Sequence, residues 1–98
     1  MKDYWQNYIN GKFVDGGAGK IQVDNPGTGE KLADQAIADN NDVDEAVSAA
    51  KKVHESGFLT NMRPVERARM VKKIGEYLLE NIEEIAPLLS MEAGKTLF

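Results

Sequence analysis

The chain has 98 residues, no cysteine and a net charge of −4, with 42% apolar and 29% charged residues. This composition is typical of one small folded protein, and it excludes a disulfide framework or a thiolate zinc site within these residues. No apolar run approaches the roughly 20 residues that cross a bilayer, and the first residues lack a secretory signal. We therefore expect a cytoplasmic protein with no membrane partner. The acidic balance argues against nucleic acid as a partner, because phosphate backbones bind basic surfaces.

Residues 1–40 are predicted to form strands and turns. Asn10-Gly11 is a strong signal for a two-residue hairpin turn, because both positions need positive φ. Residues 21–24 alternate apolar and polar side chains, as a half-buried strand does, and residues 32–38 continue in an extended pattern. Between them, the proline and glycines of residues 25–30 predict a turn. The first part of the chain is thus expected to contain β-hairpins.

Residues 41–57 are predicted to form the first helix. Asp42 and Glu45 approximate a capping box, and Gly57 is placed to end the helix. Its apolar positions recur at helical spacing and are small: Val43, Ala46, Val47, Ala50 and Val53.

Residues 61–95 are predicted to form a long second helix, with Pro64 in its first turn. We expect a break near Pro87, because a proline inside a helix removes one hydrogen bond and clashes with the preceding turn. Apolar residues recur at steps of three or four, the pattern of one buried face: Ala68, Val71, Ile74, Leu78, Ile82, Ile85 and Leu89.

This apolar face is wider than the preceding segments can cover. Basic residues also come first in the second helix and acidic residues last, which opposes the helix dipole, so the helix depends on tertiary contacts. An exposed patch of this kind marks an interface. Either the chain self-associates, or its partner is the rest of a larger polypeptide.

Two motifs that suggest chemistry have simpler interpretations. The triplet 94–96, Gly-Lys-Thr, resembles the end of a phosphate loop, but Leu89 stands where that motif needs a glycine, so a helix C-terminus is the better interpretation. His54 is the only histidine, so one chain cannot form a multi-histidine metal site; a Ser-His-Asp triad is excluded by the same reasoning from the residues around it.

The order of five short segments resembles the beginning of an aldehyde dehydrogenase. None is specific alone, but their succession covers essentially the whole chain. They are Ile9 to Val14, Asn25-Pro26 with Thr28-Gly29-Glu30, Asp42-Val43-Asp44 with Ala46-Val47 and Ala49-Ala50, Pro64 with Glu66 to Arg69, and Glu92 to Lys95.

The resemblance implies an intact enzyme that oxidises an aldehyde to a carboxylic acid with NAD or NADP. In that family a cysteine thiolate attacks the carbonyl and a glutamate-activated water releases the acid. The cysteine, the glutamate, the oxyanion-hole asparagine and the main dinucleotide contacts would all lie beyond residue 98. This chain would then hold no catalytic and no cofactor-binding residue. The implied fold is an α+β fragment, with N-terminal β-hairpins followed by two helices that form the outer layer of the cofactor domain.

The resemblance also implies one candidate site, for a monovalent cation. Its ligands would be backbone carbonyls at Val23 and Asp24 and the carboxylate of Glu92. Oxygen ligands of this kind suit a hard cation such as potassium or sodium. The alternative is that Glu92 is simply a glutamate near a helix end.

Two functions remain open from the sequence. The first is the N-terminal segment of an NAD(P)-dependent aldehyde dehydrogenase, inactive alone, whose partner is the remainder of the dehydrogenase chain. The second is a free-standing interaction module that derives from this family and binds through the long helix.

Overall fold

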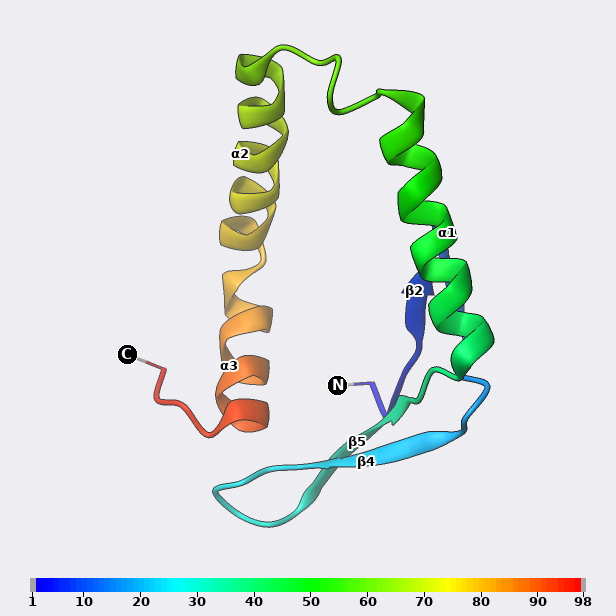
Figure 1. The fold of residues 1–98 in the computed structure, drawn as a ribbon. Helices are drawn as coiled ribbons and strands as arrows, with labels where there is room; N and C mark the ends of the chain where they lie inside the picture. The colour runs from blue at the N-terminus through cyan, green and yellow to red at the C-terminus, as the bar shows by residue number, and fades with distance from the viewer. Residues whose placement is uncertain (1, 98) are drawn as a thin grey trace.

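Strands precede helices along the chain in the computed structural model, which describes residues 2–97. This order confirms the expected α+β class (Figure 1). The described elements are β1 (Tyr4–Trp5), β2 (Asn7–Ile9), β3 (Lys12–Val14), β4 (Lys20–Asp24), β5 (Lys31–Ala36), α1 (Asn40–Ser56), α2 (Pro64–Glu80) and α3 (Ile82–Ala93).

The hairpin of β2 and β3 is confirmed where the sequence predicts it. The two strands are antiparallel, and the turn residues Asn10 and Gly11 have φ of 52° and 76°, as a type I′ turn requires. Tyr8 and Phe13 face each other across the strands, with ring centroids 4.9 Å apart in an edge-on arrangement. A cross-strand aromatic pair of this kind stabilises the hairpin.

The second sheet has the strand order β1-β5-β4. Strands β4 and β5 form an antiparallel hairpin, and β1 pairs with the other edge of β5 in a parallel register, with Tyr4 opposite Asp34 and Trp5 opposite Gln35. The Asp34 N–H also donates to the Asp3 carbonyl at 2.8 Å. The sequence does not predict β1, because two residues that pair far along the chain carry no periodic signal.

Helix α1 begins one turn earlier than its predicted capping box. Asp39 is the N-cap: its side chain accepts a hydrogen bond from the Asp42 N–H at 2.8 Å, and the Asp42 side chain accepts one from the Asp39 N–H at 2.9 Å. The predicted box of Asp42 and Glu45 is therefore wrong, since Asp42 already occupies the third helical position. The predicted end is confirmed, with Gly57 in the left-handed region at φ 75°.

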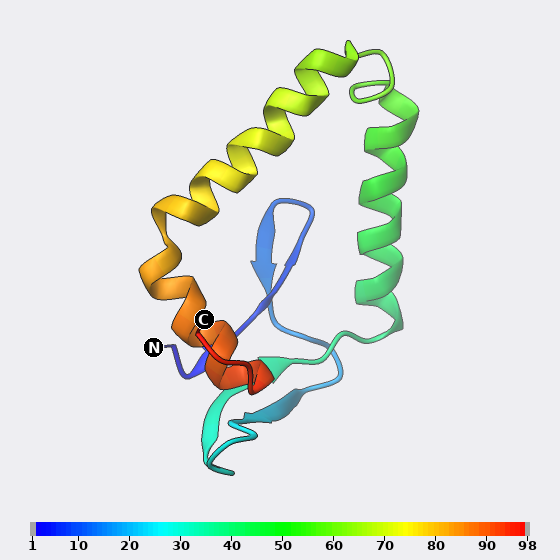
Figure 2. The ribbon, with the colours of Figure 1, turned by 90° about the vertical axis from the view of Figure 1, so that its left-hand side faces the viewer.

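The predicted long helix over residues 61–95 is two helices. Pro64 is at the start of α2, as expected, but the break lies at Asn81 and not near Pro87. Asn81 has non-helical φ of −110° and ψ of 18°, and its Nδ2 donates to the Tyr77 carbonyl at 2.9 Å. Pro87 is tolerated inside α3, because the bond that it removes would go to the carbonyl of exposed Glu83. The helix axis changes direction between α2 and α3 (Figure 2).

The described chain forms an open frame and has very little core. Helices α1 and α2 stand apart, joined by a loop at one end (Figures 1 and 2). Among residues 2–97, the buried apolar side chains are Ala33 and Ala36, both in β5. The radius of gyration is 17.0 Å, compared with about 13 Å for a compact chain of this length.

Candidate cation site and the adjoining groove

A groove of about 320 Å³ lies between α3 and the three-stranded sheet. Its walls are mostly apolar, and they come from both ends of the chain. The strands contribute Trp5, Val23, Leu32, Ala33 and Gln35, and α3 contributes Ile85, Leu88, Leu89 and Glu92.

The turn after β4 fixes one end of this region. The Asn25 side chain accepts a hydrogen bond from the Gly27 N–H at 2.8 Å, and its backbone carbonyl accepts one from the Gly29 N–H at 2.7 Å. Gly94, just after α3, lies directly against this turn, since a Cβ on Gly94 would be 2.9 Å from Pro26 Cγ. The turn and the end of α3 are therefore neighbours, although they are far apart in sequence.

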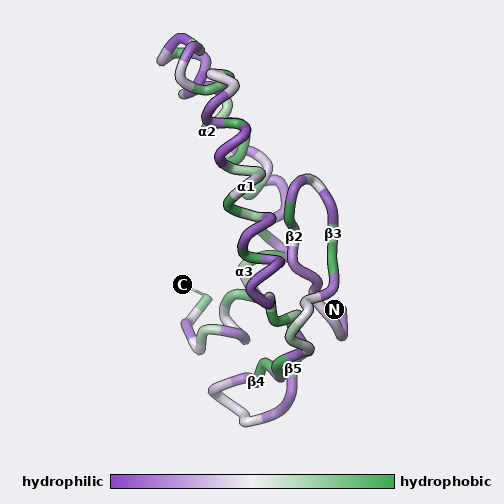
Figure 3. The backbone as a smooth tube through the Cα atoms, turned by 45° about the vertical axis from the view of Figure 1, so that its right-hand side comes forward, coloured by the Kyte–Doolittle hydropathy of each residue, from purple (hydrophilic) through white to green (hydrophobic). Residues whose placement is uncertain are grey.

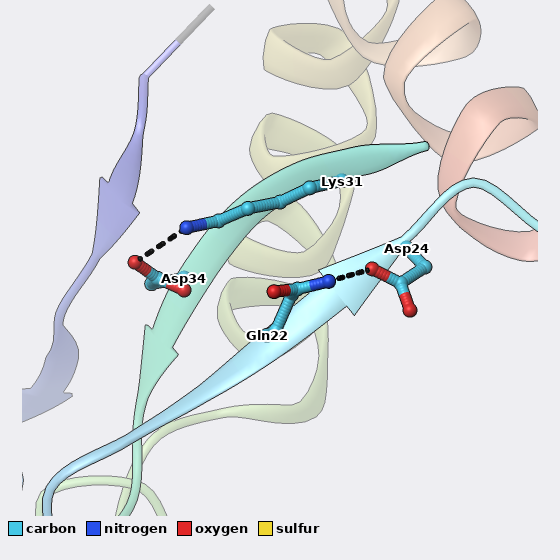
Figure 4. Close-up of polar contacts among 4 residues, drawn as sticks. All are labelled: Gln22, Asp24, Lys31 and Asp34. Carbon is cyan, nitrogen blue, oxygen red and sulfur yellow. Dashed lines mark hydrogen bonds and ion pairs between the residues drawn. The ribbon is translucent and has the colours of Figure 1, made fainter. Parts of the chain in front are cut away.

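The structure brings two of the three predicted cation ligands to one groove. Val23 and Glu92 both border it, whereas Asp24 does not belong to its lining. Asp24 ends β4, and its carboxylate accepts a hydrogen bond from Gln22 Nε2 at 2.6 Å (Figure 4). On the neighbouring strand, Lys31 forms an ion pair with Asp34 at 3.1 Å.

The chemistry of this arrangement is that of carbonyl oxygens with one carboxylate. In residues 2–97, no three side chains of His, Cys, Asp or Glu gather as metal ligands. The predicted site does not need such a cluster, because it relies on the backbone oxygens of Val23 and Asp24 beside Glu92. The cation site stays a prediction.

A second polar cluster links the N-terminal strand to the loop after β3. Asp15 accepts hydrogen bonds from the Tyr4 hydroxyl at 2.8 Å and from Gln6 Nε2 at 3.0 Å. The Gln6 amide, the Tyr4 hydroxyl and the charge of Lys20 lower the pKa of Asp15, and the hydrogen bond to Asp15 raises the pKa of Tyr4. The Lys20 ammonium lies 4.5 Å from the centroid of the Tyr4 ring. This cluster fixes the position of β1, and sequence reasoning left its aromatic residues without a role.

A third cluster connects the same loop to the start of α1. The Asp42 carboxylate accepts hydrogen bonds from the Gly17 N–H at 2.8 Å and from the Asp39 N–H, and these donors lower the pKa of Asp42. The approach is close: a Cβ on Gly17 would lie 1.9 Å from Asp39 Oδ2, and one on Gly16 would lie 2.0 Å from the Ile37 carbonyl oxygen. Both glycines are therefore required by packing.

The Gly-Lys-Thr triplet follows a helix end, as the sequence favours. Gly94 is the C-cap of α3 at φ 72°, and its N–H donates to the Ser90 carbonyl at 2.9 Å. Within the described part of the chain, no helix is long and apolar enough to span a membrane.

Comparison with known proteins identifies the family. The profile of the aldehyde dehydrogenase family matches residues 13–98. The chain belongs to the aldehyde dehydrogenase family. It is 42% identical to malonate-semialdehyde dehydrogenase 1 of Oceanobacillus iheyensis over 95 residues, which are 96% of this chain and 19% of that protein. It is also 39% identical to aldehyde dehydrogenase family 2 member C4 of Arabidopsis thaliana, over 90% of this chain and 18% of the relative.

Solved aldehyde dehydrogenases share the arrangement of strands and helices. The NAD-dependent aldehyde dehydrogenase of Sinorhizobium meliloti superposes with a TM-score of 0.88 at 34% identity, over 99% of this chain and 20% of that one. The betaine aldehyde dehydrogenase of Staphylococcus aureus, solved with NAD+, gives a TM-score of 0.86 at 27% identity, over 94% of this chain and 19% of that one. This aldehyde dehydrogenase chain thus spans about a fifth of the length of the relatives that it matches.

Proposed function

We propose that this chain supplies the N-terminal outer layer of the cofactor domain in a cytoplasmic NAD- or NADP-dependent aldehyde dehydrogenase, and that it has no activity alone. The observation that carries the proposal is the match to intact dehydrogenases over nearly the whole chain but only a fifth of theirs. The absence of cysteine supports the inactive state, because the thiolate mechanism of the family needs one.

A chimera tests this function directly. Residues 1–98 would replace the matching segment of the Oceanobacillus iheyensis relative, to which this chain is 42% identical. We expect the chimera to form NADH from malonate semialdehyde, and we expect the 98-residue chain to form neither NADH nor NADPH with that substrate. An inactive but folded chimera, or turnover by the cysteine-free chain, would contradict the proposal.

We further propose that the carbonyls of Val23 and Asp24 and the Glu92 carboxylate hold potassium or sodium in the assembled enzyme. Support comes from Val23 and Glu92, which border one groove beside the Asn25-Pro26 turn. In the chimera, Glu92→Gln should abolish a stabilisation by potassium or sodium that the unchanged chimera shows in thermal unfolding, because it removes the carboxylate charge. Equal responses of the two proteins to these salts, measured against choline chloride, would reject the site.

In the absence of the rest of the enzyme, we propose that copies of the chain associate through their exposed apolar faces. Large apolar side chains are exposed on all three helices, including Val47, Ile74 and Leu89. Surfaces of this kind associate in water.

A further inference from the structure

We propose that the α2 stripe, defined as Val71, Ile74 and Leu78, is a docking surface that binds the remaining part of an aldehyde dehydrogenase as a separate polypeptide. The partner is the part of a family chain that follows the segment matched by residues 1–98. This inference rests on the proposed function, and it adds the surface and the occupant.

The α2 stripe has no cover in the described chain. Every residue from Ala68 to Glu80 is exposed, and Val71 and Ile74 are 68% and 63% exposed. These side chains recur at steps of three and four, so they form one face of the helix. Figure 3 shows polar and apolar segments alternating along α1 and α2. A helix of this length is marginal in water without packing, so α2 needs a partner along this face.

The amount of exposed surface favours a large partner over a second copy. The accessible surface is 7983 Å² for a mass of 10.8 kDa, whereas a compact protein of this mass exposes about 5,500 Å². The excess is about three times the roughly 800 Å² per partner of a standard interface. A two-fold dimer uses one self-complementary patch, which would leave most of this excess uncovered.

The shape of the frame also favours the rest of a dehydrogenase. Helices α1 and α2 stand apart, although collapse onto each other would cover both apolar faces (Figure 2). The same backbone arrangement occurs in the intact Sinorhizobium meliloti enzyme, with a TM-score of 0.88, where four-fifths of the polypeptide lies outside the matched segment. Helices of an α/β layer bury their apolar faces against a sheet. The frame therefore has the form that fits a partner of that kind.

A capture experiment tests the surface. The affinity-tagged chain is co-expressed with the Oceanobacillus iheyensis relative from which the matching segment has been deleted. Two double variants are compared, and each introduces two glutamines into α2 without changing the net charge. Val71→Gln with Ile74→Gln alters the α2 stripe, whereas Lys73→Gln with Glu80→Gln alters the opposite face.

We expect the unchanged chain and the opposite-face variant to capture the truncated relative, and the stripe variant to capture at least roughly tenfold less. In the unchanged chain, amide exchange at residues 71–78 should slow when the relative is present. In sedimentation, the chain should associate with itself when alone, and the relative should displace that association.

The proposal is overturned if the unchanged chain captures nothing, if both variants capture equally, or if copies remain associated with each other while the relative stays unbound. Circular dichroism of the stripe variant controls for lost helix, since its changed side chains are already exposed. If the stripe variant unfolds, the exchange measurement on the unchanged chain decides. Capture together with an inactive chimera would contradict only the proposed function, and an active chimera without capture would contradict only the docking surface.

Discussion

The contacts of Asp42 show how one carboxylate can connect two segments. It accepts hydrogen bonds from the N–H groups of Gly17 and Asp39, and these bonds favour its charged form and lower its pKa. A group whose pKa is lower in the folded state stabilises that state above its unfolded pKa, near the ordinary value of 3.8, and loses the contribution as the pH falls through the folded value. Acid should therefore release the loop before α1 loses its later turns.

The first residue-scale prediction follows from this sign. Between pH 6 and pH 2, amide exchange at Gly17 and Asp39 should accelerate as Asp42 gains a proton, and Asp42→Asn should show fast exchange throughout. The matched control is Asp44→Asn, which removes a charge from the same helical turn without removing the hydrogen bond to Gly17. If the control and Asp42→Asn behave alike, the effect belongs to net charge and not to the contact.

At the element scale, the break between α2 and α3 depends on Asn81. Asparagine competes with the helix by hydrogen bonding to nearby backbone, and here its Nδ2 donates to the Tyr77 carbonyl. Pro87 costs one helical bond inside α3 but does not set the boundary. The sequence shows both residues, and the proline is the stronger general helix breaker, which explains why the predicted break lies in the wrong place.

Two substitutions separate these causes. Asn81→Leu should join α2 and α3 into one helix, detected by continuous helical chemical shifts across residues 79–84. Pro87→Ala should leave the break in place while it stabilises α3, by up to about 3 kcal/mol, which is the cost of proline relative to alanine in a helix interior. If Pro87→Ala closed the break and Asn81→Leu did not, the assignment to Asn81 would be wrong.

Elements set by local chemistry are the ones that the sequence predicts well. The positive φ of Asn10 and Gly11, the left-handed cap at Gly57 and the start of α2 at Pro64 all depend on a few adjacent residues. The capping box of Asp39 was missed because two overlapping aspartates both fit the pattern. For the candidate site, family resemblance suggests Val23 and Glu92, but the apolar groove beside them needs the fold.

At the scale of the whole molecule, stability depends on surface that this chain cannot cover alone. Ala33 and Ala36, the buried apolar side chains of the described residues, contribute little transfer free energy, since alanine has one methyl group. The sequence predicts this shortage from the width of the apolar face in residues 61–95. It does not predict the open frame, because the spacing of α1 and α2 is a property of tertiary structure.

The two-residue strand β1 has a consequence for aggregation. By pairing with β5 at Asp34 and Gln35, it covers an edge whose backbone groups would otherwise face solvent. An uncovered strand edge is a template for pairing with another chain. Removal of the first five residues would therefore expose β5, and the shortened protein should form intermolecular sheet more readily than the full chain.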